Sequence, residues 1–140
     1  MKLTYNGKSI TVRIIDQCPE CPSDHLFDVS KDAFQSLAPL SLGKVWMDYE
    51  FVPCSFNTNI VYNVLPNSNK WWMSVVVQKH NVGVKKFEVK GKNGNWVSAN
   101  RVDYNEFIYE SHGTLEAPLS FRVTGTNDEV ITDTDIVTSL

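Results

Sequence analysis

Residues 69–78 of this chain read Asn-Lys-Trp-Trp-Met-Ser-Val-Val-Val-Gln, two adjacent tryptophans followed by a β-branched run. This composition predicts a β-strand, in which successive side chains point to opposite faces of a sheet. Alternation assigns one set of side chains to the core (Trp71, Met73, Val75 and Val77) and the other to the surface (Trp72, Ser74, Val76 and Gln78). Both indoles are difficult to bury in this pattern, so we expect at least the Trp72 ring to belong to a binding surface. The simpler alternative is that both rings fill a core.

The rest of the second half shows the same pattern of alternating hydrophobicity. Short segments of alternating hydrophobicity occur at 60–64, 71–79, 82–90, 96–99, 105–109, 117–124 and 130–133, with turn-forming residues between them. Several short strands at this spacing, without a helix pattern, predict an antiparallel β-sandwich.

The first half has a different pattern. Asn6-Gly7 is a hairpin signal, and an alternating strand is predicted over 9–16. A polar loop over 17–27 precedes a predicted helix over 28–38, with Ser30 as its N-cap, and a second strand is predicted over 45–52. We therefore expect an all-β chain of two domains, 1–55 and 56–140.

Composition excludes several classes of protein. The chain has 140 residues, 42% of them hydrophobic and 21% charged, which is typical of a globular protein. Its net charge of −3 argues against a nucleic-acid partner. No apolar run is long enough to cross a membrane, and the first residues contain no apolar signal-peptide segment.

Three cysteines allow two interpretations. One is a disulfide that leaves the third thiol unpaired. The other is a zinc site, because Cys18 and Cys21 are two residues apart and are followed by His25 and Cys54. The second closely spaced ligand pair of a zinc ribbon is missing, so we predict no metal.

The chain resembles the expansin family over nearly its whole length. The first half carries the matching segments Asp16-Gln17-Cys18-Pro19-Glu20-Cys21, Leu26-Phe27-Asp28-Val29-Ser30 and Val52-Pro53-Cys54, and the second carries Lys70-Trp71-Trp72, Gln78-Lys79-His80-Asn81, Lys92-Asn93-Gly94-Asn95-Trp96 and Val102-Asp103-Tyr104-Asn105-Glu106-Phe107. The resemblance implies a partial double-psi β-barrel followed by an immunoglobulin-like β-sandwich, the second being a carbohydrate-binding module of family 63.

The resemblance also carries expectations about extent and cysteines. The family's first domain is about twice as long as residues 1–54, so the chain is expected to be N-terminally truncated, and an extracellular location is inferred from the family. The strand ending at Cys54 should pack against the cysteine loop of the same half-barrel. We therefore expect Cys54 to lie beside Cys18 or Cys21, with the choice of partner open.

The resemblance implies two sets of functional residues. Asp16 and Asp28 correspond to acidic groove positions, and Asp28 matches the catalytic acid of family 45 glycoside hydrolases, which need a second carboxylate across the groove. Trp71, Trp72 and Tyr104 correspond to a linear aromatic platform, which disagrees with the burial of Trp71 that alternation predicts unless the strand begins irregularly there.

The expected function is non-hydrolytic binding, and wall loosening, of cellulose-containing wall polysaccharide by a monomer without cofactors. The alternatives are a family 45-like hydrolase remnant and a binding module without wall-loosening activity.

Overall fold

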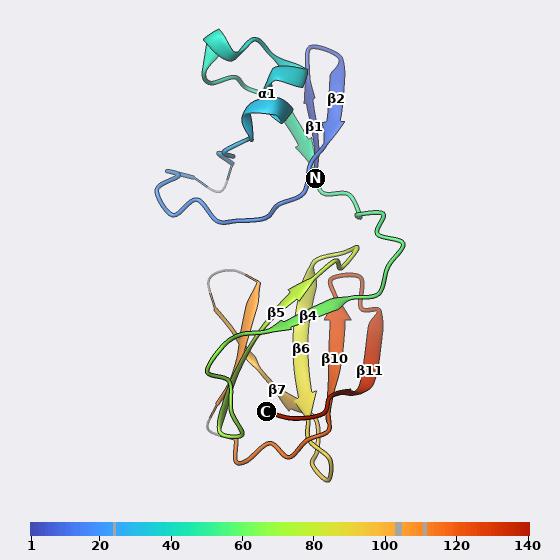
Figure 1. Ribbon diagram of the computed structural model, residues 1–140. Coiled ribbons are helices and arrows are strands. Elements are labelled where there is room, and N and C mark those ends of the chain that lie inside the picture. Colours follow the sequence, from blue (N-terminus) through green and yellow to red (C-terminus); the bar gives the residue numbers. More distant parts are fainter. Residues whose placement is uncertain (24, 103–104, 111) are drawn as a thin grey trace. The chain divides into compact units, whose positions relative to one another are not determined.

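The computed structural model describes residues 1–23, 25–102, 105–110 and 112–140, which form two compact units, Met1–Cys54 and Ser55–Leu140 (Figure 1). In these ranges every strand pairing is antiparallel, and α1 (Lys31–Leu37) is the one α-helix. The all-β prediction is therefore confirmed. No helix in the described part of the chain has the length and apolarity that crossing a membrane requires.

The first unit contains a three-stranded sheet of order β2-β1-β3. β1 (Lys2–Tyr5) and β2 (Lys8–Thr11) form a hairpin around Asn6 and Gly7, whose φ angles of 47° and 78° are those that this dipeptide readily adopts. β3 (Asp48–Glu50) pairs with the other edge of β1, and the 3-10 turn η1 (Leu40–Leu42) follows α1. The core of this unit is small and consists of Met1, Leu3, Leu37 and Ala38, with partly buried neighbours.

Three predicted boundaries in this unit are wrong. The strand predicted over 9–16 ends at Thr11, where its ladder with β1 ends, and Ile14 and Ile15 are 56% and 79% exposed. The strand predicted over 45–52 is reduced to β3. The helix starts at Lys31 rather than at Asp28; Ser30 holds the N-cap position, but its side chain makes no capping hydrogen bond.

The second unit is a sandwich of two four-stranded sheets (Figure 1). One has the order β4-β5-β9-β8 and contains β4 (Val61–Val64), β5 (Trp72–Gln78), β9 (Glu106–Glu110) and β8 (Asn100–Arg101). The other has the order β11-β10-β6-β7 and contains β11 (Val130–Val137), β10 (Leu119–Gly125), β6 (Val84–Lys90) and β7 (Val97–Ser98). Each strand predicted in this half is present, with ends that shift by a few residues, and β8 is an addition.

The facing sides of the two sheets form one continuous core. Its fully buried aromatic side chains are Phe87 on β6, Phe107 on β9 and Phe121 on β10, with ring centroids of neighbouring pairs 5.1–5.3 Å apart. Tyr62 on β4 packs 5.1 Å from Phe121 and donates its hydroxyl to Asp133 at 2.7 Å; burial, assisted by this carboxylate, raises its pKa. Every member of this core lies within the second unit. This buried apolar core holds the two sheets together, and the sheets form a stable support for the side chains on their outer faces.

Candidate functional site

The two tryptophans lie at the start of β5. Trp71 precedes the strand and is 60% exposed, whereas Trp72 is the first strand residue and is half-buried. The burial of Trp71 that alternation predicts is therefore wrong, because strand geometry begins only at Trp72. Met73, Val75 and Val77 are fully buried, as predicted. Since Trp71 lies outside the ladder, its indole is on the surface, and Trp72 follows it as the first residue of β5.

One side chain, Asn69, holds the backbone of both tryptophans. Its Oδ1 accepts the N–H of Trp71 at 2.9 Å and the N–H of Trp72 at 3.2 Å, while its Nδ2 donates to the carbonyl of Asn67 at 3.1 Å. The Asn69 N–H in turn donates to the Trp72 carbonyl at 2.7 Å. This is the local side-chain-to-backbone pattern that Asn forms at turns. It determines how the chain enters β5, and with it the direction of both indoles.

Lys70 lies beside the exposed ring. Its Nζ is 5.5 Å from the centroid of Trp71, within the range of a cation–π contact, and its carbonyl accepts the N–H of Leu115 at 2.7 Å. The backbone at Lys70 is thus tied to a second loop of the same unit. An aromatic face and an ammonium group are therefore presented together.

The outer face of β5 is less exposed than predicted. Ser74 was assigned to the surface but is fully buried, because its hydroxyl donates to the carboxylate of Glu106, itself only 7% exposed, and its N–H donates to Ser68 Oγ at 3.2 Å. Ser68 Oγ also donates to the carbonyl of Leu65 at 2.7 Å. Buried polar groups need such partners. The loop that carries Asn69 is therefore fastened to β5 at two places.

The third expected platform residue, Tyr104, lies outside the described residues. Its neighbour Asn105 is described and well anchored: its Oδ1 accepts from Arg101 Nη2 at 2.8 Å, and its Nδ2 lies 3.1 Å from His80 Nε2 and donates to the carbonyl of Val77. The chain that follows Tyr104 is thus attached to β5, the strand that begins with Trp72.

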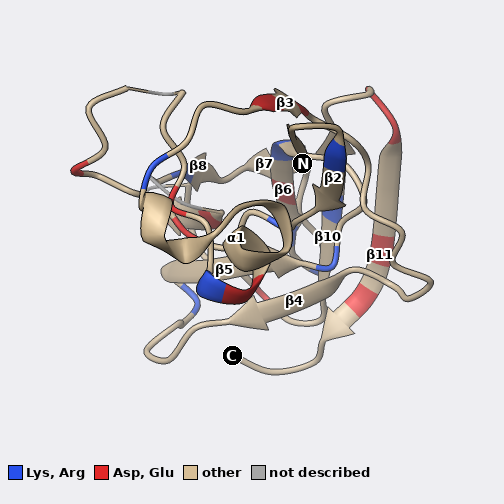
Figure 2. Ribbon diagram, turned by 90° about the horizontal axis from the view of Figure 1, so that it is seen from above, with Lys and Arg blue, Asp and Glu red and all other residues tan. Residues whose placement is uncertain are grey.

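The other sheet presents a different outer face. Arg122 donates from Nε and Nη2 to both oxygens of Glu88, at 2.8 and 2.7 Å, and its guanidinium carbon lies 4.5 Å from the ring centroid of Trp96. These hydrogen bonds hold the pKa of Glu88 below its ordinary value, although burial opposes the shift. Acidic positions on β11 lie on the same sheet (Figure 2). Trp96 is half-buried beneath this guanidinium, so it is less accessible than Trp71, which is 60% exposed.

The first unit brings its two predicted acidic residues together. Asp16 and Asp28 line one cavity of about 380 Å³, along with Arg13 and Cys18. Asp28 also borders a second cavity of about 490 Å³, whose lining includes His25 and Trp46. Both carboxylates are exposed. Asp24, the nearby carboxylate of the same loop, lies outside the described residues.

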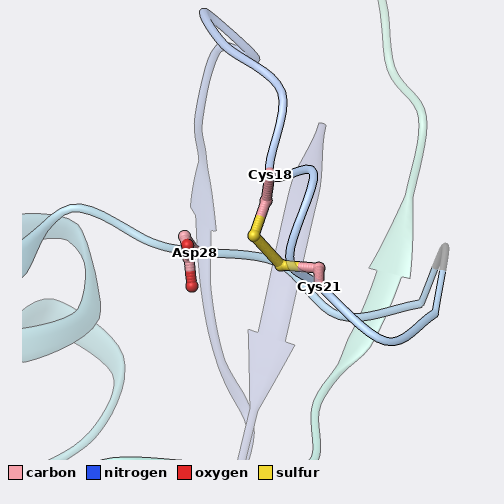
Figure 3. A group of neighbouring side chains, drawn as sticks. All are labelled: Cys18, Cys21 and Asp28. Atoms are coloured by element: carbon pink, nitrogen blue, oxygen red, sulfur yellow. A yellow bond between two sulfur atoms is a disulfide. The ribbon is translucent and has the colours of Figure 1, made fainter.

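The cysteine pairing differs from the prediction. Cys18 and Cys21 form a disulfide, with their Cα atoms 5.4 Å apart, and Cys54 is free (Figure 3). The reason is local: the N–H of Cys21 donates to the carbonyl of Cys18 at 3.1 Å, so a turn brings the two cysteines together without any other segment. Cys54 follows β3 in the connection between the units rather than ending a strand.

Comparison with known proteins identifies the family. Residues 57–136 match the family model of the expansin-like protein middle domain, which is more than half of the chain. The chain belongs to the expansin family. The first unit matches, over residues 1–49, a double-psi β-barrel family described as lytic transglycolase.

Curated expansins align with most of this expansin. Expansin-YoaJ of Bacillus subtilis (strain 168) is 31% identical over 128 residues, 91% of this chain and 53% of that protein. Expansin-A7 of Arabidopsis thaliana is 33% identical over 139 residues, 86% of this chain and 50% of that protein. The chain therefore spans about half the length of these curated relatives.

A solved structure confirms the architecture. The apo Clavibacter michiganensis expansin superposes with a TM-score of 0.82 at 22% identity, covering 96% of this chain and 65% of that one. At this identity the likeness concerns the fold, and it agrees with the predicted combination of a β-barrel part and a β-sandwich.

Two features of the site were not predicted from the sequence. The bifurcated acceptor at Asn69 has a sequence signal, because an Asn three residues before a strand start is typical of a side-chain-closed turn. The pair of Ser74 and Glu106 has none, since only the register of β5 against β9 brings these residues together.

Proposed function

We propose that this expansin binds cellulose-containing cell-wall polysaccharide without hydrolysing it, through the platform formed by Trp71, Trp72 and Tyr104. The observation that carries the proposal is the exposed Trp71 indole, at a turn where Asn69 binds the backbone N–H groups of Trp71 and Trp72. Aromatic faces at the surface of a rigid sheet can stack on pyranose rings, whose C–H groups then leave water. A mutant of the Clavibacter michiganensis expansin forms a complex with cellohexaose, which supports this ligand class.

The proposal assigns a separate role to each unit. Residues 56–140 form the cellulose-binding sandwich, and residues 1–55 supply Asp16 and Asp28 to a groove that contacts polysaccharide and loosens the wall without bond cleavage. The protein acts as an extracellular monomer without a cofactor, as the family resemblance implies. The contact between sugar and ring is apolar, so it needs neither a metal nor a redox group.

A cellulose pull-down tests the binding surface. We expect the Trp71→Ala, Trp72→Ala and Tyr104→Ala variants of the full chain to bind microcrystalline cellulose less than the wild type. Phe51→Ala is the control, because Phe51 is also a large exposed aromatic, at 69%, but lies in the first unit. Undiminished binding by the three platform variants, or an equal loss in the control, would show that the assignment is wrong.

The competing function is polysaccharide cleavage. It is favoured by the position of Asp16 and Asp28 on one cavity and by the match of the first unit to the lytic transglycolase family. Glycosidases place two carboxyl groups across the scissile bond. Release of soluble sugar from cellulose or peptidoglycan by the wild type but not by Asp28→Asn would establish cleavage and overturn the non-hydrolytic proposal.

A further inference from the structure

The disulfide of the first unit lies against a carboxylate. The Sγ atoms of Cys18 and Cys21 and a carboxylate oxygen of Asp28 all lie within 4.8 Å of one another (Figure 3). Two sulfurs and an oxygen are a donor set that zinc readily accepts once the sulfurs are thiolates. We propose that reduction of this disulfide by a dithiol converts Cys18, Cys21 and Asp28 into a Zn²⁺ site.

The donors of a tetrahedral zinc site are spaced differently from those of the oxidised chain, in which the two sulfurs are bonded to each other. With Zn–S bonds of about 2.3 Å and a Zn–O bond of about 2.0 Å, tetrahedral ligand atoms lie roughly 3.5–3.8 Å apart. The donors here lie within 4.8 Å of one another. Once reduction has broken the S–S bond, rotation of the cysteine and aspartate side chains can bring them to that spacing. Three protein ligands leave the fourth position to water.

The backbone holds the donors together independently of the S–S bond. The hydrogen bond from the Cys21 N–H to the Cys18 carbonyl closes the turn at 3.1 Å and involves neither sulfur atom. On the other side, Phe27 and Val29 both pack against the core of the unit, which fixes the segment that carries Asp28. A donor set that is already assembled needs little ordering to bind an ion.

The two steps balance in atoms and electrons. A dithiol delivers two electrons and two protons to the Cys18–Cys21 disulfide and becomes a disulfide itself, leaving two protein thiols. Zn²⁺ then displaces the two thiol protons, which go to solvent, and is coordinated by the two thiolates and by the Asp28 carboxylate. An oxidant of the disulfide class reverses the first step, because the sulfurs bond to each other again and release the ion.

The proposed zinc site belongs to the first unit, whereas the aromatic platform belongs to the second unit. In the oxidised chain both sulfurs are engaged in the disulfide, so the proposed zinc site forms only after reduction. In the reduced chain Asp28 would bind zinc instead of facing the cavity that it shares with Asp16. Reducing conditions together with zinc would therefore engage one of the two carboxylates of that cavity in a metal site, at a point that Cys18 also lines.

Zinc titration of the full chain tests the proposal. All samples carry Cys54→Ser, which removes the free thiol and leaves two cysteines. One sample is kept oxidised; the other is reduced with dithiothreitol and desalted without oxygen, because dithiols themselves bind zinc. We expect one zinc per reduced chain, none per oxidised chain, and, with Co²⁺ in place of zinc, a charge-transfer band of two thiolates. Equal zinc in both samples would overturn the proposal.

Matched variants assign the third ligand. Asp28→Asn keeps the shape of the side chain but removes its charge, and we expect at least about tenfold weaker zinc binding in the reduced chain. Asp32→Asn is the control, since Asp32 is exposed on α1 and outside the donor set, and its zinc affinity should equal that of the reference chain. Equal affinity in both variants would exclude Asp28. A circular dichroism spectrum of each reduced sample identifies loss of fold, and unfolding of the reduced reference chain would also refute the site.

Discussion

Replacement of Trp71 by alanine tests the platform most directly. The residue is 60% exposed, so of roughly 250 Å² for a whole tryptophan about 150 Å² faces solvent, and one ring face accounts for about half of this, about 75 Å². A sugar stacked on that face removes this apolar area from water, worth about 1.9 kcal/mol at about 25 cal/mol per Å². The variant should therefore bind cellulose roughly 20-fold more weakly.

The same exposure predicts that folding is hardly affected. Surface substitutions usually change the free energy of unfolding by less than about 0.5 kcal/mol, whereas truncation of a core aromatic costs about 3–5 kcal/mol. Depletion isotherms on microcrystalline cellulose and thermal unfolding of the same samples separate the two effects. Trp72→Ala is the informative comparison, because its half-buried ring should cost both affinity and stability. A large drop in stability with unchanged affinity for Trp71→Ala would refute the reasoning.

Four further predictions follow from particular contacts. Asn69→Ala should weaken cellulose binding in a pull-down, because the backbone N–H groups of Trp71 and Trp72 lose the side-chain oxygen that accepts them. Asn69→Asp keeps an acceptor oxygen and should bind nearly as well as the wild type; equal losses in the two variants would exclude a positioning role. Arg122→Leu should destabilise the chain by about 1.5–3 kcal/mol at pH 7 in urea unfolding, because it removes charged hydrogen bonds to Glu88. The pKa of Glu88 is lowered in the folded state, so this stabilisation is present above the ordinary value of 4.5 and is lost as the pH falls through the folded-state pKa. If the wild type and the variant still differed by the same free energy of unfolding at about pH 2, this explanation would be contradicted. The wild type should release no reducing sugar from cellulose, xylan or β-glucan, and Asp28-dependent release would refute this. Residues 56–140 should unfold cooperatively and bind cellulose when expressed alone, since their core is self-contained; an aggregated or unfolded product would show that the first unit is required.

Much of the second unit could be predicted because its signal is local. In a sandwich strand one face is buried, so hydrophobic residues recur every second position. Met73, Val75 and Val77 on β5 and Leu119, Phe121 and Val123 on β10 follow this rule, and on β6 it holds for Phe87 and Val89. This alternation predicts that Val75, Phe87 and Phe121 are buried, and all three are.

The first unit was less predictable because its boundaries depend on pairing partners. The alternation that runs to Asp16 is a property of the sequence, but a strand continues only as far as its neighbour does, and the ladder between β2 and β1 ends at Thr11. The cysteine pairing was missed for the opposite reason. The expectation relied on a long-range approach of Cys54, whereas a local turn at Cys18 and Cys21 was sufficient.

The sequence by itself determined the all-β class, the strands of the sandwich and the presence of two tryptophans at the entry to one of them, because side-chain period and turn chemistry are local. Only the tertiary structure decided which indole is exposed, since that depends on where the ladder of β5 begins and on the Asn69 side chain that closes the loop before it. It also decided that Ser74 is buried against Glu106 and that Asp28 lies beside a disulfide. These contacts join residues from separate segments, and no local pattern along the chain encodes which of them meet once strands pair and loops close.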